Sequence, residues 1–172
     1  LVANMQQARA CLGQFGSDGQ PLLREGQEVM IAPLPLYHIY AFTANCMCMM
    51  VSGNHNVLIT NPRDIGGFIK ELKNWKFSAL LGLNTLFVAL MEHPDFKTLD
   101  FSTLKLTNSG GTALVKATAE RWEQITGCRI TEGYGLTETS PVACTNPYGD
   151  QSRLGTVGLP VPGTLLKVIN DD

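Results

Sequence analysis

The stretch LKLTNSGGTALVKATAERWEQITGCRITEGYG, residues 104–135, contains a complete strand–helix–strand unit. Its apolar beginning predicts a strand over residues 104–108, and a second strand is expected over residues 129–132. The region between them, residues 115–126, has the pattern of a helix. Because strands that alternate with helices usually pair in parallel, this unit predicts an α/β protein.

Three residues are expected to mark helix ends. Thr112 has the hydroxyl side chain of a helix cap and precedes the helix predicted over residues 115–126. Gly127 follows that helix directly, at a position where a left-handed residue commonly ends a helix. Asp64 is placed to cap a further helix, predicted over residues 62–75.

The same alternation of apolar strand-like runs and helix-like runs extends toward the N-terminus. Strands this apolar, each followed by a helix, predict a mostly parallel sheet whose two faces are covered by helices. The additional strands are expected at residues 29–33, 56–60 and 79–83, and the additional helices at residues 38–52, 62–75 and 85–92.

The beginning of the chain predicts an amphipathic helix over residues 1–15. Apolar side chains recur there at helical spacing and share one face. They are Leu1, Met5, Ala8 and Leu12. This face is expected to pack against the sheet.

The end of the chain has a different pattern. After Pro141 the sequence breaks into short segments separated by Gly and Pro, which predicts a short β-rich C-terminal segment. We therefore expect an α/β subdomain over residues 1–145, followed over residues 146–172 by the incomplete start of a β-rich neighbouring subdomain.

Composition and charge exclude some classes of protein. The net charge is −2, and the scattered Lys and Arg residues form no basic stripe, so nucleic acid is not an expected partner. Hydrophobic residues make up 44% of the chain. The most apolar run, residues 39–51, is too short to span a bilayer and is expected to be a buried helix.

The five cysteines predict reduced thiols in a cytosolic protein. Their number is odd, and no two of them form a CxxC pair or a zinc-type spacing. They are Cys11, Cys46, Cys48, Cys128 and Cys144. Cys46 and Cys48 lie in the apolar helical run and are expected to pack as small hydrophobic side chains.

The run EGYGLTETSP, residues 132–141, has the residue types needed to bind a nucleotide. Tyr134 offers a flat ring, and Gly135 lets a ligand approach the backbone. Thr137 offers a hydroxyl donor, and Glu138 is a hard oxygen ligand suited to Mg²⁺. The residues alone fit an ordinary strand-to-loop turn equally well.

Small and polar residues follow four of the predicted strands. His38 follows the first strand and Asn84 the strand over residues 79–83. Gly110 and Gly133 follow the last two strands of the series. Open parallel sheets bind ligands beyond the carboxyl ends of their strands, so these positions predict a single crevice.

Four sequence blocks, in this order, resemble the adenylate-forming superfamily. They are PLPLYHIYAF at residues 33–42, TNSGGTAL at 107–114, EGYGLTETSP at 132–141 and GTVGLPVPGT at 155–164. The chain is most similar to bacterial long-chain fatty acid–CoA ligases, for which NPRDI at 61–65 and GLNTLF at 82–87 are also typical. The resemblance covers essentially the whole chain.

The resemblance implies an ATP-dependent ligase with ATP, Mg²⁺ and CoA as cofactor, metal and co-substrate. Such an enzyme joins the carboxylate of a long-chain fatty acid to AMP and then transfers the acyl group to CoA. By this resemblance, Glu138 ligates Mg²⁺, Thr137 hydrogen-bonds the phosphate and Tyr134 stacks on adenine. The location implied is cytoplasmic, and the full-length enzyme is compatible with peripheral association at the inner face of the cell membrane and with oligomers.

The resemblance also implies roles for residues that bind the substrates. Gly110, Gly111 and Thr112 would line the slot for the nucleotide and the acyl carbonyl, together with Gly135. His38 would be the third catalytic residue, beside Thr137 and Glu138, and would orient the substrate carboxylate. From the residues alone, however, a histidine beside a tyrosine after a strand fits a structural role.

An aromatic gate to the acyl tunnel occurs in some long-chain members of the family. Phe42 occupies the corresponding place in this chain, although a core phenylalanine explains the residue as well. Met-rich residues follow it and could form the wall of an apolar channel, or could simply pack in the core.

The intact protein is expected to need more chain than these 172 residues. Related enzymes have an upstream phosphate loop, a downstream aspartate for the ribose and a C-terminal domain with a catalytic lysine. We therefore expect an internal fragment that is inactive alone and that contacts the rest of its parent chain. Two alternatives stay open: an adenylating enzyme for an aryl acid, an amino acid or a luciferin, and a non-catalytic binding module.

Overall fold

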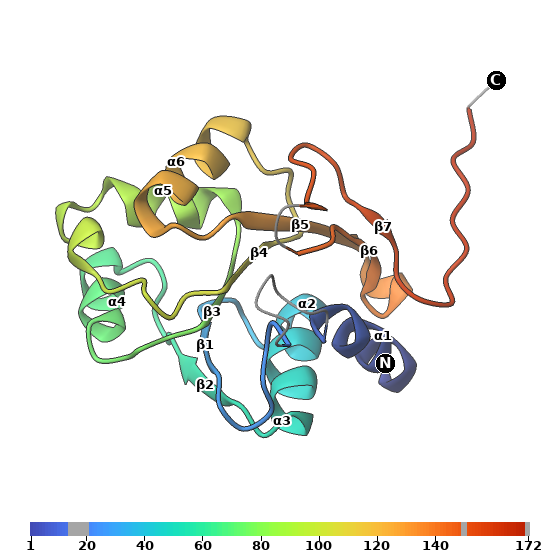
Figure 1. The fold of residues 1–172 in the computed structure, drawn as a ribbon, viewed down its shortest axis with the longest axis horizontal. Helices are drawn as coiled ribbons and strands as arrows, with labels where there is room; N and C mark the ends of the chain where they lie inside the picture. The colour runs from blue at the N-terminus through green and yellow to red at the C-terminus, as the bar shows by residue number, and fades with distance from the viewer. Residues whose placement is uncertain (14–20, 149–150, 171–172) are drawn as a thin grey trace.

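The computed structural model describes residues 1–13, 21–148 and 151–170. Within these residues, seven strands form one sheet in the order β2-β1-β3-β4-β5-β6-β7 (Figure 1). The first five strands are parallel, and β6 and β7 are antiparallel. The predicted α/β fold with a mostly parallel sheet is therefore confirmed. The strands are β1 Val29–Ala32, β2 His55–Leu58, β3 Ala79–Gly82, β4 Leu106–Ser109, β5 Ile130–Gly135, β6 Val142–Thr145 and β7 Leu159–Pro160.

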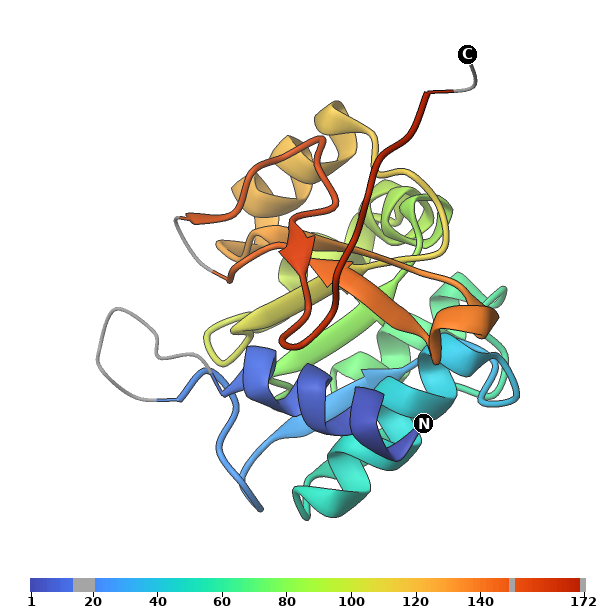
Figure 2. The same ribbon diagram turned by 90° about the vertical axis from the view of Figure 1, so that its right-hand side faces the viewer.

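Helices cover the sheet on both faces (Figures 1 and 2). One face packs against α4, α5 and α6, and the other packs against α1 and the continuous segment α2–η1–α3. The helices are α1 Val2–Leu12, α2 Ile39–Ala41, η1 Phe42–Cys48, α3 Met49–Val51, α4 Ile65–Leu72, α5 Asn84–Glu92, η2 Pro94–Thr98, α6 Lys116–Thr126 and η3 Thr137–Thr139.

Alternation along the strands explains why both faces are buried. On β1, Ile31 points into the core beneath α4–α6, and its neighbour Met30 points toward α1 and η1. On β3, Leu80 and Leu81 divide between the two cores in the same way. Because successive strand residues point to opposite faces, a strand covered on both sides needs an unbroken apolar run.

The helix predicted over residues 38–52 is present but has an unexpected centre. His38 caps it, and the segment then widens into the seven-residue π-helix η1 before ending in α3. Wide turns of this kind are rare and occur often beside functional sites. Within the residues that the structure describes, no helix is long and apolar enough to cross a membrane.

Two of the three predicted helix ends are confirmed. The side chain of Asp64 accepts a hydrogen bond from the first turn of α4, and Gly127 ends α6 with a left-handed φ of 71°. The predicted cap Thr112 is wrong, because α6 begins later, after Val115. No side-chain hydrogen bond caps α6, but the amide of Val115, the residue before it, donates to Oδ1 of Asn84 of α5 at 3.0 Å.

The N-terminal helix packs as predicted along most of its face. Met5 is buried, and Ala8 and Leu12 pack against the same core. Leu1 is 52% exposed, so its expected place on the buried face is wrong. Residue 15, the predicted end of the helix, lies outside the described residues.

The C-terminal segment extends the main sheet. Instead of leaving the sheet after Pro141, the chain returns as β6 along β5, and β7 then pairs with β6. Pro162 and Thr164 accept hydrogen bonds from Gln7 of α1, and the end of the chain then projects away from the helices and strands (Figure 1). The expected division between residues 1–145 and 146–172 stays a prediction.

A buried carboxylate lies where the parallel strands begin. Glu28 directly precedes β1 and is 3% exposed. Its Oε1 accepts hydrogen bonds from Lys105 Nζ at 2.8 Å and from the Arg24 amide at 2.9 Å. Burial opposes ionisation of Glu28, but the hydrogen bonds from Lys105, Arg24 and Ser78 outweigh it and hold the pKa of its carboxyl below the ordinary value.

Replacing this carboxylate should reduce stability in a pH-dependent way. At pH 7, we expect Glu28→Gln to lower the free energy of unfolding by about 1–3 kcal/mol, because the partners lose a charged acceptor. A depressed pKa stabilises the fold above the unfolded pKa of Glu, about 4.3, and this contribution is lost as the pH falls through the folded pKa. The difference between wild type and variant should therefore shrink on acidification.

Urea unfolding at neutral and acidic pH measures this difference. Glu120→Gln is the matched control, because Glu120 is exposed and pairs only loosely with Lys116 on the surface of α6. Equal losses for the two variants, or a difference that does not depend on pH, would contradict the role assigned to Glu28.

Candidate functional site

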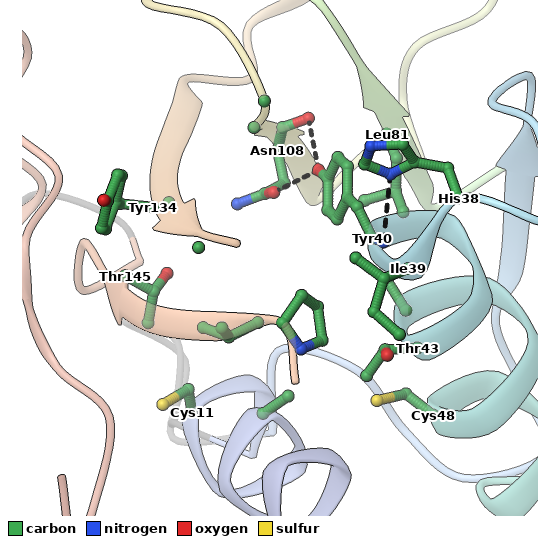
Figure 3. Close-up of a pocket in the computed structure, with 18 of the residues that line it drawn as sticks. Cys11, His38, Ile39, Tyr40, Thr43, Cys48, Leu81, Asn108, Tyr134 and Thr145 are labelled. Atoms are coloured by element: carbon green, nitrogen blue, oxygen red, sulfur yellow. Dashed lines mark hydrogen bonds between the residues drawn. The ribbon is translucent and has the colours of Figure 1, made fainter. Parts of the chain in front are cut away.

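A cavity of about 340 Å³ opens at the carboxyl ends of the parallel strands (Figure 3). It lies between the sheet and the layer formed by α1 and η1. In doubly wound sheets, ligands bind at this edge, near the point where the order of the strands reverses. That point lies here between β1 and β3, since β2 flanks β1 on one side and β3 on the other.

The interior of the cavity is apolar. Strand side chains form one wall, and small or flexible side chains of α1 and η1 form the opposite wall. The lining includes Ala8, Leu12, Met30, Ala44, Leu81 and Leu106. Two thiols, Cys11 and Cys48, also face it. Burial raises the pKa of both, that of Cys48 to about 11, so both are neutral thiols at physiological pH.

The mouth of the cavity is polar and combines residues from three predicted sequence blocks. His38 follows β1, Gly110 and Gly111 follow β4, and Tyr134 lies on β5. Tyr134 is 44% exposed and lies across the cavity from His38 and Tyr40 (Figure 3). Of the four predicted strand-end groups, three therefore line one cavity, whereas the side chain of Asn84 binds the amide of Val115 before α6.

Tyr40 lines the cavity beside His38 (Figure 3). Its hydroxyl donates to Oδ1 of Asn108 (Figure 3), and the amide group of Asn108 donates in turn to the Thr131 carbonyl at 3.0 Å. Burial raises the pKa of Tyr40, so its hydroxyl stays protonated. The ring lies next to Gly110, where a Cβ atom would come within 3.2 Å of it. A side chain at residue 110 would therefore require the ring to shift by a few tenths of an ångström.

His38 is oriented by its own helix. Its Nδ1 accepts a hydrogen bond from the Tyr40 amide at 3.2 Å. In a neutral imidazole this places the proton on Nε2, which then acts as a donor. Because His38 lines the mouth, such a donor suits an anionic oxygen atom there.

The turn after β5 presents Thr137 and Glu138 at the mouth. Both side chains are exposed and line the cavity. Among the described residues of this lining, Glu138 is the one acidic side chain, and no group of three His, Cys, Asp or Glu side chains in the described chain could hold a metal. A single carboxylate still fits Mg²⁺ that arrives with a nucleotide, because such ions are bound by one or two carboxylates together with substrate phosphates.

Glu132 connects the loops around this site. Its Oε1 accepts from the Leu114 amide at 3.2 Å, and its Oε2 accepts from the Gly155 amide at 3.1 Å. Its backbone carbonyl accepts from the amide of Asn146, a residue that is 2% exposed. The side chain of Asn146 donates to the Thr156 carbonyl. The side chains of Glu132 and Asn146 together therefore fix the segment around residue 155 to β5.

A model of the AMP-binding enzyme family matches residues 1–172. This chain belongs to the AMP-binding enzymes. Among its relatives is the long-chain-fatty-acid–CoA ligase of Escherichia coli O157:H7, which is 46% identical over 172 residues, 100% of this chain and 29% of that protein. The ligase of the same name from Haemophilus influenzae is 51% identical over 142 residues, 83% of this chain and 25% of that protein.

Solved structures have the same fold. The crystal structure of an anthranilate CoA ligase in complex with anthranoyl-AMP superposes with a TM-score of 0.83 at 24% identity, over 98% of this chain and 31% of that chain. This AMP-binding chain thus spans less than a third of the length of each of these relatives.

Two residues predicted for the site do not line the cavity. Phe42 is 39% exposed and Thr112 is exposed, and neither contributes to the lining. Three residues that shape the cavity or the loops beside it were not predicted: Tyr40, Asn108 and Glu132. Tyr40 and Asn108 meet across 68 residues, and no local pattern indicates such a pair.

Gly135 has a structural role that its motif did not indicate. A Cβ atom there would overlap the carbonyl oxygen of Pro141 and would lie 3.2 Å from the Cα of Val142. It would point at the neighbouring backbone and away from any acyl slot. Glycine at this position allows β5 and β6 to approach closely at a break in their register.

We expect Gly135→Ala to destabilise the chain by about 1–3 kcal/mol, because backbone cannot yield as a flexible side chain can. Gly66→Ala is the control: its Cβ would have only ordinary contacts of 3.8 Å inside α4, where alanine is a better helix former. Urea unfolding of both variants measures the effect. A Gly135→Ala variant as stable as wild type would show that β6 does not pack this closely on β5.

Proposed function

We propose that this chain forms the central part of the active site of a long-chain fatty acid–CoA ligase. The observation that supports it most directly is that one cavity has a polar mouth and an apolar interior, with the ring of Tyr40 in its lining. The names of the relatives agree with this assignment. The full-length protein would use ATP, Mg²⁺ and CoA, with a fatty acid as substrate.

The reaction would take place in two steps at the mouth. In the first, a carboxylate oxygen of the fatty acid attacks the α-phosphorus of ATP, and pyrophosphate leaves with the electrons of the broken P–O bond. In the second, the thiolate of CoA attacks the acyl carbonyl carbon, and AMP leaves. The first step brings two anions together, so it needs positive charge and hydrogen-bond donors around the phosphorus.

The residues at the mouth would divide these tasks. Tyr134 would pack against adenine, and the hydroxyl of Thr137 would donate to a phosphate oxygen. Glu138 would hold the Mg²⁺ that neutralises phosphate charge. Nε2 of His38 would donate to the fatty acid carboxylate and orient it, whereas Gly110 leaves room for the acyl carbonyl beside Tyr40.

The lining favours an apolar acyl group over an amino acid. A substrate ammonium group needs a carboxylate beside it, and the interior lining within the described residues contains none. Most of its side chains are Ala, Leu, Met and Cys, which suit an alkyl chain, and its polar groups, such as Thr43 and Tyr148, are uncharged. This observation separates a fatty acid from the amino-acid alternative.

Glu138 is the first residue to test in the full-length protein that contains this segment. We expect Glu138→Ala to slow ATP–pyrophosphate exchange by about 100-fold or more, because loss of a metal ligand removes several kcal/mol of transition-state stabilisation. The fold should survive, since the side chain is exposed. Glu120→Ala on the surface of α6 should exchange like wild type, and near-normal exchange by Glu138→Ala would refute the assignment.

Chain-length selectivity tests the interior of the cavity. Ala44 of η1 lines it, so Ala44→Phe should lower kcat/KM for palmitate relative to octanoate by about tenfold. Phe42→Ala is the neighbouring control and should leave the ratio unchanged, because Phe42 is not part of the lining. A change with Phe42→Ala but not with Ala44→Phe would restore Phe42 as the gate and place the alkyl chain elsewhere.

A further inference from the structure

Asn4 of α1 makes an unusual contact with a residue 138 positions away. Its Nδ2 donates to the carbonyl of Val142 at 2.7 Å, and its Oδ1 accepts from the amide of the same residue at 2.9 Å. Asn4 is 6% exposed. A carboxamide has one acceptor and donors in the same plane, as a peptide group does, so this side chain pairs with Val142 as a neighbouring strand would.

The position of Val142 in the sheet explains why such a partner is needed. Val142 is the first residue of β6, and β7 pairs only with Cys144 and Thr145 farther along that strand. Buried backbone groups that lack a partner are costly, so the beginning of β6 needs another donor and acceptor. Asn4 supplies both.

Val142 also ends the turn that presents Thr137 and Glu138. The beginning of the turn is tied to its end, because the Leu136 amide donates to the carbonyl of Pro141 at 3.1 Å. Pro141 directly precedes Val142. Whatever fixes Val142 therefore also fixes the base of this turn.

Helix α1 is itself fixed to the sheet and to the cavity. Met5 is buried in the core beneath β1 and β3, and Ala8 and Leu12 line the apolar interior. The contact of Asn4 thus connects the wall of the interior to the turn at the mouth.

We propose that Asn4 is a positioning residue that holds the Thr137–Glu138 turn in place for the first step of the reaction. The proposal rests on the proposed function. Asn4 does not line the cavity, so it acts through Val142 and Pro141. Displacement of a group by about 1 Å can cost roughly 100-fold in rate, so loss of this contact should lower kcat.

The test compares three variants of α1 in the full-length protein. Asn4→Ser is too short to reach both groups of Val142. Arg9→Ala is the matched control, because Arg9 also ties α1 to another part of the chain, through an ion pair with Glu25 rather than through the turn. Asn4→Asp keeps the acceptor for the Val142 amide and loses the donor to its carbonyl.

Two readouts are measured for each variant. For Asn4→Ser we expect faster amide hydrogen exchange over residues 136–142 and a kcat for ATP–pyrophosphate exchange at least tenfold lower, with the KM for palmitate within about twofold of wild type. Asn4→Asp should be intermediate in both. Arg9→Ala should keep the wild-type hydrogen exchange over residues 136–142 and the wild-type kcat.

Three results would overturn the proposal. Unchanged hydrogen exchange over residues 136–142 in Asn4→Ser would show that Asn4 does not hold the turn. Faster hydrogen exchange with an unchanged kcat would show that the position of the turn does not matter for the reaction. Equal losses in Asn4→Ser and Arg9→Ala would show that both variants act only through the docking of α1.

Failure of the proposed function would look different. A wild-type protein that catalyses no pyrophosphate exchange with any fatty acid would refute the ligase assignment and, with it, the catalytic consequence of Asn4. The hydrogen-exchange comparison does not depend on activity and would still decide whether Asn4 holds the turn.

Discussion

The carboxylate of Glu132 is shared between two loops that meet beside the cavity. One oxygen accepts from Leu114, at the end of the loop that contains the two glycines, and the other accepts from Gly155. The backbone carbonyl of the same residue binds the buried Asn146. Three segments of the site that are distant in the sequence are therefore positioned by one residue of β5. These bonds hold the two loops and the segment at Asn146 beside one strand of the site.

Buried polar groups occur at both ends of the parallel strands, where the strands begin and where they end, for the same physical reason. Both faces of the sheet are covered by apolar layers, so polar side chains collect where strands begin or end. At the beginning, the carboxylate of Glu28 pairs with Lys105. At the end, Tyr40 and Asn108 bond to each other and line the cavity. The polar groups at the beginning therefore serve stability, whereas those at the end lie where the proposed ligand would bind.

The parts of the fold that could be predicted from the sequence depend on local patterns. Apolar runs located all five parallel strands, and Asp64 and Gly127 were recognised as helix ends because capping and left-handed turns depend on nearby residues. Thr112 failed as a cap because α6 begins only after Val115, whose amide is held by Asn84 from another helix. The π-helix was not predicted, since its residues have the same apolar pattern as an α-helix.

The residues at the mouth could be predicted only where a motif contained them. His38, Tyr134 and Glu138 lie within short blocks with recognisable residue types, and the fold brings them to one cavity. Tyr40 and Asn4 were missed because their partners lie 68 and 138 residues away. Only the three-dimensional structure shows which distant backbone or side chain each of them contacts.

The central claim is that one cavity receives the acyl chain in its interior and the nucleotide at its mouth. A crystal structure of the full-length protein with a non-hydrolysable palmitoyl-adenylate analogue tests this claim most directly. We expect the adenine ring against Tyr134, the acyl carbonyl beside Gly110 and the alkyl chain between the sheet and α1, in contact with Leu12 and Ala44. A structure in which the alkyl chain of the analogue lies outside this cavity would contradict the claim.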